Sequence, residues 1–251
     1  MRDEIIEHIL QLEQEHDIQI LLATESGSRA WGCPSPDSDY DIRIIYKRAK
    51  EHYLEIDDKP DTINYFHGKL LDINGWDIKK TLKLIRKSNA TPFEWAQSPI
   101  VYKEVDEFKN TILRLCRRYF QPRHTVNHYK GIATNSYLSN DLRGKIELKK
   151  LFYILRPIMA ANWIIEKNEV PPMNIPKLIE IIQDTEISAH IKELVELKSS
   201  VNEDYIHKTK PLITRYIDDQ FEIINSAQIE DNSFPSNSVL LNQTFMQIIE
   251  A

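Results

Sequence analysis

The chain has 251 residues, a net charge of −6, 41% hydrophobic residues and 28% charged residues, which is the composition of an ordinary water-soluble globular protein. The opening residues MRDEIIEHIL lack the apolar core of a secretory signal, and the longest apolar run, residues 151–165, is short and contains Arg156, so a membrane span is excluded. Cys33 and Cys116 match no metal-ligand spacing, and we therefore expect reduced thiols in a cytoplasmic protein.

The first hundred residues mix helix and strand signals. Residues 3–16 repeat apolar side chains at helical spacing, and the apolar runs 18–24 and 40–46 are typical of strands. Residues 61–73 predict a third strand or a hairpin arm, with a turn at Asn74-Gly75. Asp77 is positioned to cap a helix over 78–88, and a short helix around Glu94-Trp95 and a strand ending at residue 102 complete this part.

Beyond Glu104 the pattern becomes helical. Helices are predicted within residues 107–120, 124–138, 145–166, 175–184, 188–197 and 204–221, and the last residues form either a loose tail or a packed final helix. The sequence therefore predicts an α+β domain over 1–103, an all-helical domain over 104–225 and a C-terminal tail or helix over 226–251.

The helical part also differs in charge. Residues 104–168 hold twelve Lys and Arg against six Asp and Glu, although the whole chain is acidic. This asymmetry suits a protein that holds a polyanion beside carboxylate-bound cations, and an ordinary solvated helix surface explains it equally well.

Two aspartates lie close together in the stretch SDYDIRIIY. Because strand side chains alternate between faces, Asp39, Asp41 and Arg43 project from the same side of the predicted strand. Two carboxylates on one face repel unless a positive charge lies between them, and a divalent cation such as Mg²⁺ supplies it through oxygen ligands. The pattern predicts a metal site, with Arg43 facing phosphates that the metal holds.

Gly27, Ser28 and Arg29 follow the strand 18–24. A glycine directly after a strand lets the backbone approach a ligand, and a helix beginning at Ser28 offers free N–H groups to phosphate. The Ser28 hydroxyl and the Arg29 guanidinium add further donors. These three residues are therefore candidate nucleotide-binding residues.

A strand, Gly-Ser, a gap of ten residues and then Asp-x-Asp on the next strand resembles the DNA polymerase β-like nucleotidyltransferase superfamily. The resemblance implies a third carboxylate on a later strand. Asp72 in KLLDING is the best match, with Asp77 as a rival at a helix N-cap and Asp61 as a weaker candidate. It also implies that Asp39, Asp41 and Asp72 are catalytic and hold two Mg²⁺ or Mn²⁺ ions.

A narrower resemblance extends over most of residues 20–175. The segments ESGSRAWG, SDYDIRIIY, GWDIKKTLKLIRKSN, FEWAQSPIVY, HYKGIATNSY and LKKLFYILRPIMAANWI are similar to the predicted bacterial nucleotidyltransferases that are associated with RNA ligase in RNA repair. The resemblance implies a nucleotidyltransferase domain followed by a helical domain that completes the acceptor site, and it leaves the acceptor open.

Other residues have both a structural and a functional interpretation. Lys149, Tyr153 and Arg156 fall on one stripe of a predicted helix, where they could contact a triphosphate or an RNA end. Glu25 is either a surface acid or a partner of Arg29 or Arg43. Three more residues are left open: Trp31 and Trp76 as packing residues or base-stacking platforms, and Lys80 as an i,i+3 partner of Asp77 or a phosphate contact.

The predicted function is metal-dependent transfer of a nucleoside monophosphate from a nucleoside triphosphate, ATP among the candidates, to an acceptor hydroxyl, with release of pyrophosphate. An RNA end is the expected acceptor, and no membrane partner is expected. Transfer to a protein or a small molecule is the alternative within enzymes, and an inactive nucleotide-sensing module is the alternative outside them.

Overall fold

The computed structural model describes residues 1–68, 70–230 and 237–251. The chain divides into two compact units: the first holds residues 1–27, 39–119 and 233–251, and the second holds 28–38 and 120–232. Each unit is described by itself. Among the described residues, no helix has both the length and the apolar character that crossing a membrane requires.

The first unit is built on a five-stranded mixed sheet with the strand order β3-β4-β2-β1-β5. The strands are β1 Gln19–Glu25, β2 Tyr40–Lys47, β3 Thr62–His67, β4 Leu71–Asp77 and β5 Val101–Glu104. β2 and β4 are parallel, and every other neighbouring pair is antiparallel. The strands predicted over 18–24 and 40–46 and the strand ending at residue 102 are confirmed.

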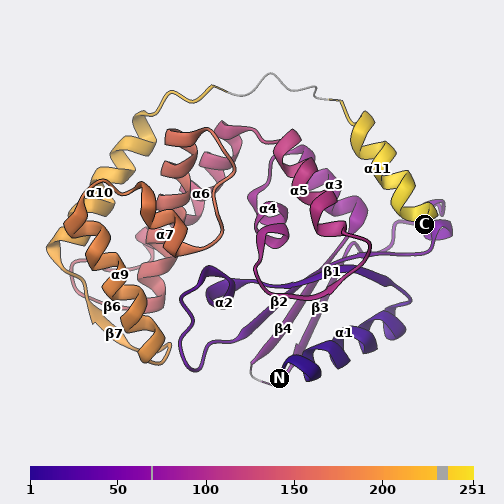
Figure 1. Ribbon diagram of the computed structural model, residues 1–251, viewed down its shortest axis with the longest axis horizontal. Coiled ribbons are helices and arrows are strands. Elements are labelled where there is room, and N and C mark those ends of the chain that lie inside the picture. Colours follow the sequence, from indigo (N-terminus) through magenta and orange to yellow (C-terminus); the bar gives the residue numbers. More distant parts are fainter. Residues whose placement is uncertain (69, 231–236) are drawn as a thin grey trace. The chain divides into compact units, whose positions relative to one another are not determined.

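Helix α1, Arg2–His16, covers one face of this sheet (Figure 1). Ile5, Ile9 and Leu12 of α1 are fully buried and form one apolar cluster with Ile42 and Ile44 of β2. Because these two β2 residues face α1, the alternating residues of β2 must face the other side of the sheet. The helical spacing of the apolar residues in 3–16 thus decides which face of the sheet remains for polar side chains.

Three further helices lie over the opposite face (Figure 1). They are α3 Ile78–Arg86, α4 Ala90–Gln97 and α5 Phe108–Arg118; a short 3-10 helix, η1 Lys50–Tyr53, precedes β3. The carboxylate of Asp77 accepts from the backbone N–H of Lys79, which confirms Asp77 as the N-cap of α3. The final residues form helix α11, Val239–Glu250, which packs against α3, so the helix alternative for the C-terminal segment is the correct one.

The predicted turn at Asn74-Gly75 is wrong. Both residues lie inside β4, and β3 and β4 form a hairpin whose connection includes Gly68 at φ 60°. Gly75 is a strand glycine for a packing reason, because a Cβ atom there would lie 2.6 Å from Cγ1 of Ile44 on the neighbouring strand. A close approach between strands therefore produced the same sequence signal as a turn.

The second unit is mostly helical. Its helices are α6 Pro122–Leu138, α7 Leu148–Lys167, α8 Ile175–Leu178, α9 Thr185–Ser200 and α10 Pro211–Ser226, with the 3-10 helix η2 Ile179–Ile181 after α8. Two short strands, β6 Lys145–Glu147 and β7 Ile206–Lys208, pair as an antiparallel ribbon. The helices predicted to begin at 145 and 204 therefore start later than expected, because their first residues pair as strands.

The two compact units do not follow a boundary at residue 103. Helix α5 packs on β1 and belongs to the first unit, and residues 28–38 belong to the second. The division into functional domains at 103 and 225 stays a prediction.

Candidate active site

Asp41 and Asp72 lie side by side on the two parallel strands of the sheet. β2 and β4 pair with Asp41 opposite Asp72. Ile42 and Ile73, the residues that follow them, are buried in the cluster under α1. Because side chains alternate along a strand, both carboxylates project from the opposite face.

Arg43 joins the two carboxylates. Its Nη2 atom donates to Oδ1 of Asp41 at 2.9 Å and to Oδ2 of Asp72 at 3.0 Å. Its Nη1 atom donates to the backbone carbonyl of Asp72 at 3.3 Å. The like charges are therefore held together by an arginine, and Arg43 has carboxylate partners where the sequence predicted phosphates.

The environment of Asp41 raises the pKa of its carboxyl group. Burial raises the pKa of Asp41, the nearby Arg43 lowers it, and the charges of Asp72 and Asp39 raise it further. Asp39 precedes β2 and is exposed. Burial is the largest of these effects, so the net shift is upward although Arg43 attracts the carboxylate.

The backbone around Asp41 is fixed from β1 and the residues that follow it. Buried Glu25 accepts from the backbone N–H of Asp41 at 2.7 Å and from the Tyr102 hydroxyl at 2.5 Å. The backbone N–H of Ser26 donates to the carbonyl of Asp41 at 2.7 Å. Gly27 has φ 57°, and a Cβ atom there would lie 2.0 Å from Oδ2 of Asp41. Gly27 therefore makes room for a carboxylate, which is a different use from the ligand approach that we predicted.

The donor set fits a hard divalent cation. Asp41 Oδ1 and Asp72 Oδ2 both contact one nitrogen and are thus no more than about 6 Å apart, around a position that already holds a positive group. The carboxylate oxygens of Asp39, Asp41 and Asp72 do not all lie within 4.8 Å of one another. Gathering all three on one cation therefore requires side-chain rotation.

The rival carboxylates lie at the other end of the sheet. Asp77 is at the far end of β4 from Asp72, roughly 16 Å along the strand. Its carboxylate accepts from the Tyr53 hydroxyl at 2.8 Å as well as capping α3. Burial raises the pKa of Asp77. Asp61 is exposed and pairs with Lys80 at 2.9 Å. Of the two interpretations of Lys80, the ion pair with Asp77 is therefore wrong, and the phosphate contact stays a prediction.

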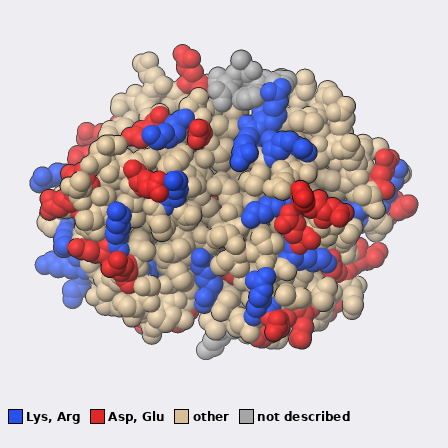
Figure 2. All heavy atoms as spheres, in the orientation of Figure 1, with Lys and Arg blue, Asp and Glu red and all other residues tan. Residues whose placement is uncertain are grey.

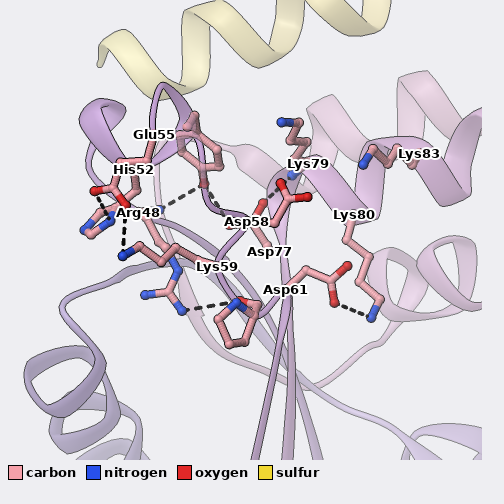
Figure 3. A pocket seen from close by; sticks show the side chains of 12 residues that line it. Arg48, His52, Glu55, Asp58, Lys59, Asp61, Asp77, Lys79, Lys80 and Lys83 are labelled. Atoms are coloured by element: carbon pink, nitrogen blue, oxygen red, sulfur yellow. Dashed lines mark hydrogen bonds and ion pairs between the residues drawn. The ribbon is translucent and has the colours of Figure 1, made fainter.

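Asp61 and Asp77 line a polar hollow of about 220 Å³ (Figure 3). Basic side chains from the strand ends and from α3, including Arg48, Lys79 and Lys83, surround it. Among the described residues that line this hollow, none is Asp39, Asp41 or Asp72. Asp77 therefore lies in a different site from Asp41 and Asp72.

In the second unit, Ser28 and Arg29 are bonded to the end of their own loop. They lie in α2, Gly27–Trp31, so a helix does begin at the predicted position. The Ser28 hydroxyl donates to Oγ of Ser38 at 3.0 Å, and Nη2 of Arg29 donates to the Ser38 carbonyl at 2.7 Å. Ser38 in turn donates to Glu203 at 2.6 Å.

Glu203 also forms an ion pair with Lys149. The Nζ atom of Lys149 lies 3.3 Å from Oε2 of Glu203, so two predicted nucleotide-binding residues, Ser28 and Lys149, connect to one carboxylate. Glu203 was not among the residues predicted from the sequence. It lies in a connection far along the chain, and no local pattern marks it.

Tyr153 and Arg156 both contact Trp31. The rings of Tyr153 and Trp31 meet edge to face at 5.6 Å, and the guanidinium of Arg156 lies 4.5 Å above the Trp31 ring. Arg156 is buried and donates to the Met173 carbonyl, whereas Tyr153 is 45% exposed. Tyr153 is thus accessible to a ligand and Arg156 is a packing residue. Of the two interpretations of Trp31, packing is the one that these contacts support. Trp76 likewise packs on Trp95.

Comparison with known proteins decides the family. The family model described as "RlaP: RNA repair pathway DNA polymerase beta family" matches residues 1–247. The chain belongs to this family. Membership confirms the predicted polymerase β-like fold class and supports nucleotidyl transfer as the reaction class.

Two individual proteins are similar to this RlaP family member. The "Uncharacterized protein YcgL" of Bacillus subtilis (strain 168) is 37% identical over 250 residues, 96% of each chain. The crystal structure of a nucleotidyltransferase-like protein from Exiguobacterium sibiricum 255-15 has a TM-score of 0.32 and 9% identity over 88% of this chain and 73% of the other. At that score, the structural similarity does not bear on fold or function.

Two more features of this RlaP family member concern its charged side chains. Glu25 is fully buried, so the interpretation of it as a surface acid is wrong. Its hydrogen bonds to Asp41 and Tyr102 could not be predicted from its position at the end of a strand. Charge is also mixed on the face drawn in Figure 2, where basic and acidic side chains are interspersed over much of the surface.

Proposed function

We propose that this protein is a metal-dependent nucleotidyltransferase that transfers a nucleoside monophosphate from a nucleoside triphosphate to an acceptor hydroxyl and releases pyrophosphate. One observation carries the proposal: in a member of the RlaP family, Asp41 and Asp72 from neighbouring parallel strands converge on one positive group. A structural ion pair needs only one carboxylate, and a second, partly buried carboxylate on the same guanidinium is typical of a functional site.

The proposed metal ligands are Asp39, Asp41 and Asp72. Bound Mg²⁺ or Mn²⁺ at such a site neutralises the charge on attacking and leaving oxygens of phosphoryl transfer. Asp72 is assigned the acceptor side, where its carboxylate helps to remove the proton of the attacking hydroxyl. Glu25 and Gly27 are positioning residues, because they fix the backbone and the carboxylate of Asp41.

Arg43 is proposed to exchange partners on nucleotide binding. Its guanidinium already has two anionic oxygens at hydrogen-bond distance, and phosphate oxygens offer the same geometry. The remaining proposed nucleotide-binding residues are Gly27, Ser28, Arg29, Lys149 and Tyr153. Hydroxyl and cationic groups of this kind recognise phosphates, and the exposed Tyr153 ring offers a surface for a base.

An RNA end is the proposed acceptor, supported by the description of the family as part of an RNA repair pathway. The test is a label-transfer assay. Purified protein, Mg²⁺ or Mn²⁺ and each α-³²P-labelled nucleoside triphosphate are incubated with RNAs that differ in their 3′ and 5′ ends, and in parallel with cell extract. Asp41→Asn is the inactive comparison, and Asp57→Asn, an exposed aspartate of the same unit, is the matched control.

The outcomes separate the candidate functions. Label on an RNA, absent with Asp41→Asn and present with Asp57→Asn, supports the full proposal. Label on a protein or a small molecule would support nucleotidyl transfer and would show that the acceptor is not RNA. Nucleotide binding without label transfer to any acceptor would favour a nucleotide-sensing module over an enzyme.

A further inference from the structure

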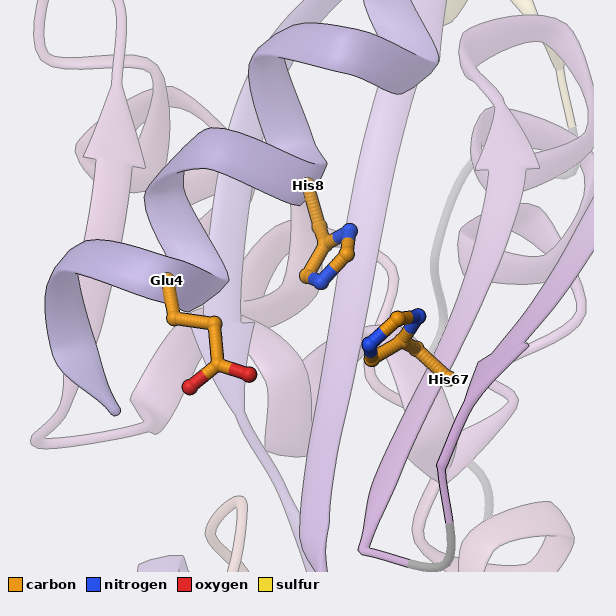
Figure 4. A group of neighbouring side chains, drawn as sticks. All are labelled: Glu4, His8 and His67. Carbon is orange, nitrogen blue, oxygen red and sulfur yellow. The ribbon is translucent and has the colours of Figure 1, made fainter.

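A group of metal-binding side chains lies on the other face of the sheet from Asp41. Glu4 and His8 are one helical turn apart on α1, and His67 is the last residue of β3. One ligand atom from each of the three lies within 4.8 Å of the other two. Figure 4 shows the carboxylate and the two rings directed into the same space.

The position of the group follows from the packing of α1. On β3, Ile63 is buried under α1, and Tyr65 packs against the same cluster, so His67 shares their side of the strand. Asp41 and Asp72 project from the opposite face. The group is therefore separate from the proposed nucleotidyl-transfer site, and its function does not depend on that proposal.

Tyr65 orients one of the two imidazoles. Its hydroxyl is 2.9 Å from Nδ1 of His8. When the proton is on Nδ1, His8 donates to the Tyr65 oxygen, and Nε2 carries the free lone pair. An outer hydrogen bond of this kind fixes the ring and tautomer of a metal-bound histidine. The His8 and His67 rings lie beside each other, with centroids 4.3 Å apart.

We propose that Glu4, His8 and His67 bind a divalent transition-metal ion, with Zn²⁺ as the best match. Two imidazole nitrogens and one carboxylate suit zinc, whereas Mg²⁺ prefers oxygen ligands alone. Ligand atoms around a tetrahedral zinc are about 3.4 Å apart, and atoms that lie within 4.8 Å of one another reach that spacing by small side-chain rotations. Glu4 and His67 are exposed and have room to rotate, and water completes the coordination.

The consequence of this site is a cross-link within the first unit. β3 is an edge strand of the sheet, and the ion would tie it to α1. Binding to the folded state alone stabilises a protein in proportion to the logarithm of the free metal concentration. Zinc is therefore expected to raise the melting temperature as well as to bind.

The test is calorimetric titration of the full chain, without a histidine tag, with ZnCl₂. All proteins in the titration carry Asp41→Asn, which weakens the separate aspartate site on the opposite face of the sheet. The expected result is one zinc per chain, with an affinity reduced at least tenfold by His67→Ala and by His8→Ala. His16→Ala removes an exposed histidine from the same helix and is expected to change nothing.

Two further measurements keep the result interpretable. Tyr65→Phe is expected to weaken zinc binding several-fold while the stoichiometry stays at one, because only the orienting hydrogen bond is lost. Zinc is expected to raise the melting temperature of the parent protein, which carries Asp41→Asn alone. It is expected to leave the melting temperature of the His67→Ala variant unchanged, and circular dichroism checks that this variant is folded. Zinc affinity that is unchanged by His67→Ala, or no zinc binding by the parent protein, would overturn the proposal.

Discussion

Gly27 packs directly against the carboxylate of Asp41. The backbone of Gly27 has φ 57°, and the nearest side-chain atom to an added Cβ would be Oδ2 of Asp41, at 2.0 Å. Real Cβ contacts are never that short, so any side chain at position 27 must displace the carboxylate. The position of the Asp41 carboxylate thus depends on a glycine at position 27.

Gly27→Ala is therefore expected to abolish label transfer and to destabilise the protein. The left-handed φ alone costs about 1 kcal/mol for a residue with a Cβ, and displacing Asp41 adds to this. Gly68→Ala is the matched control, because Gly68 has φ 60° and open space around it. Melting temperature and transfer activity separate the two effects. Equal losses of stability and full activity in both variants would show that Asp41 is not displaced.

Asp41→Asn is expected to eliminate transfer without destabilising the fold. The folded pKa of Asp41 is raised, so its ionised form costs stability above that pKa, and stability recovers as the pH falls toward the unfolded value. An amide removes this charge, and its carbonyl still accepts from Arg43. Thermal unfolding at neutral pH should show a melting temperature unchanged or roughly 1–3 °C higher. A large decrease would mean that the Arg43 contact outweighs desolvation.

Arg43→Gln is expected to lower the stability of the protein and to make it respond more strongly to divalent metal. Without the guanidinium, Asp41 and Asp72 repel each other, which should cost about 1–2 kcal/mol for this partly exposed pair. Melting temperatures are measured in EDTA and in excess MgCl₂. The rise caused by Mg²⁺ should be larger in Arg43→Gln than in the parent protein. Arg114→Gln, which removes an exposed arginine, should behave like the parent.

Both cysteines are expected to be unreactive in the folded protein. Cys33 and Cys116 are free thiols, each 1% exposed. Burial raises the pKa of Cys33 to about 11 and that of Cys116 well above its usual value, so the reactive thiolate is scarce at neutral pH. Ellman's reagent should detect no thiols in the native protein and two after unfolding in guanidinium. Rapid reaction of the native protein would contradict the packing described.

The local sequence was enough for most elements and for half of the candidate site. Helical periodicity identified α1, and alternation identified β2 and placed Asp41 and Arg43 on one face. The capping role of Asp77 is also local, because an N-cap bonds to a backbone N–H two residues away. The Gly-Ser and Asp-x-Asp segments are short and local as well, and their resemblance to the nucleotidyltransferases indicated the correct family.

The tertiary structure decided the long-range relationships. Asp72 meets Asp41 because β2 and β4 are parallel with those residues in register, and register depends on a whole face being buried. The partners of Glu25, the contact of Gly75 with Ile44 and the approach of His67 to α1 likewise join segments that are distant in the chain. Periodicity in the sequence determines the face of an element on which a side chain lies, whereas its contact partners are determined only by the packing of distant segments.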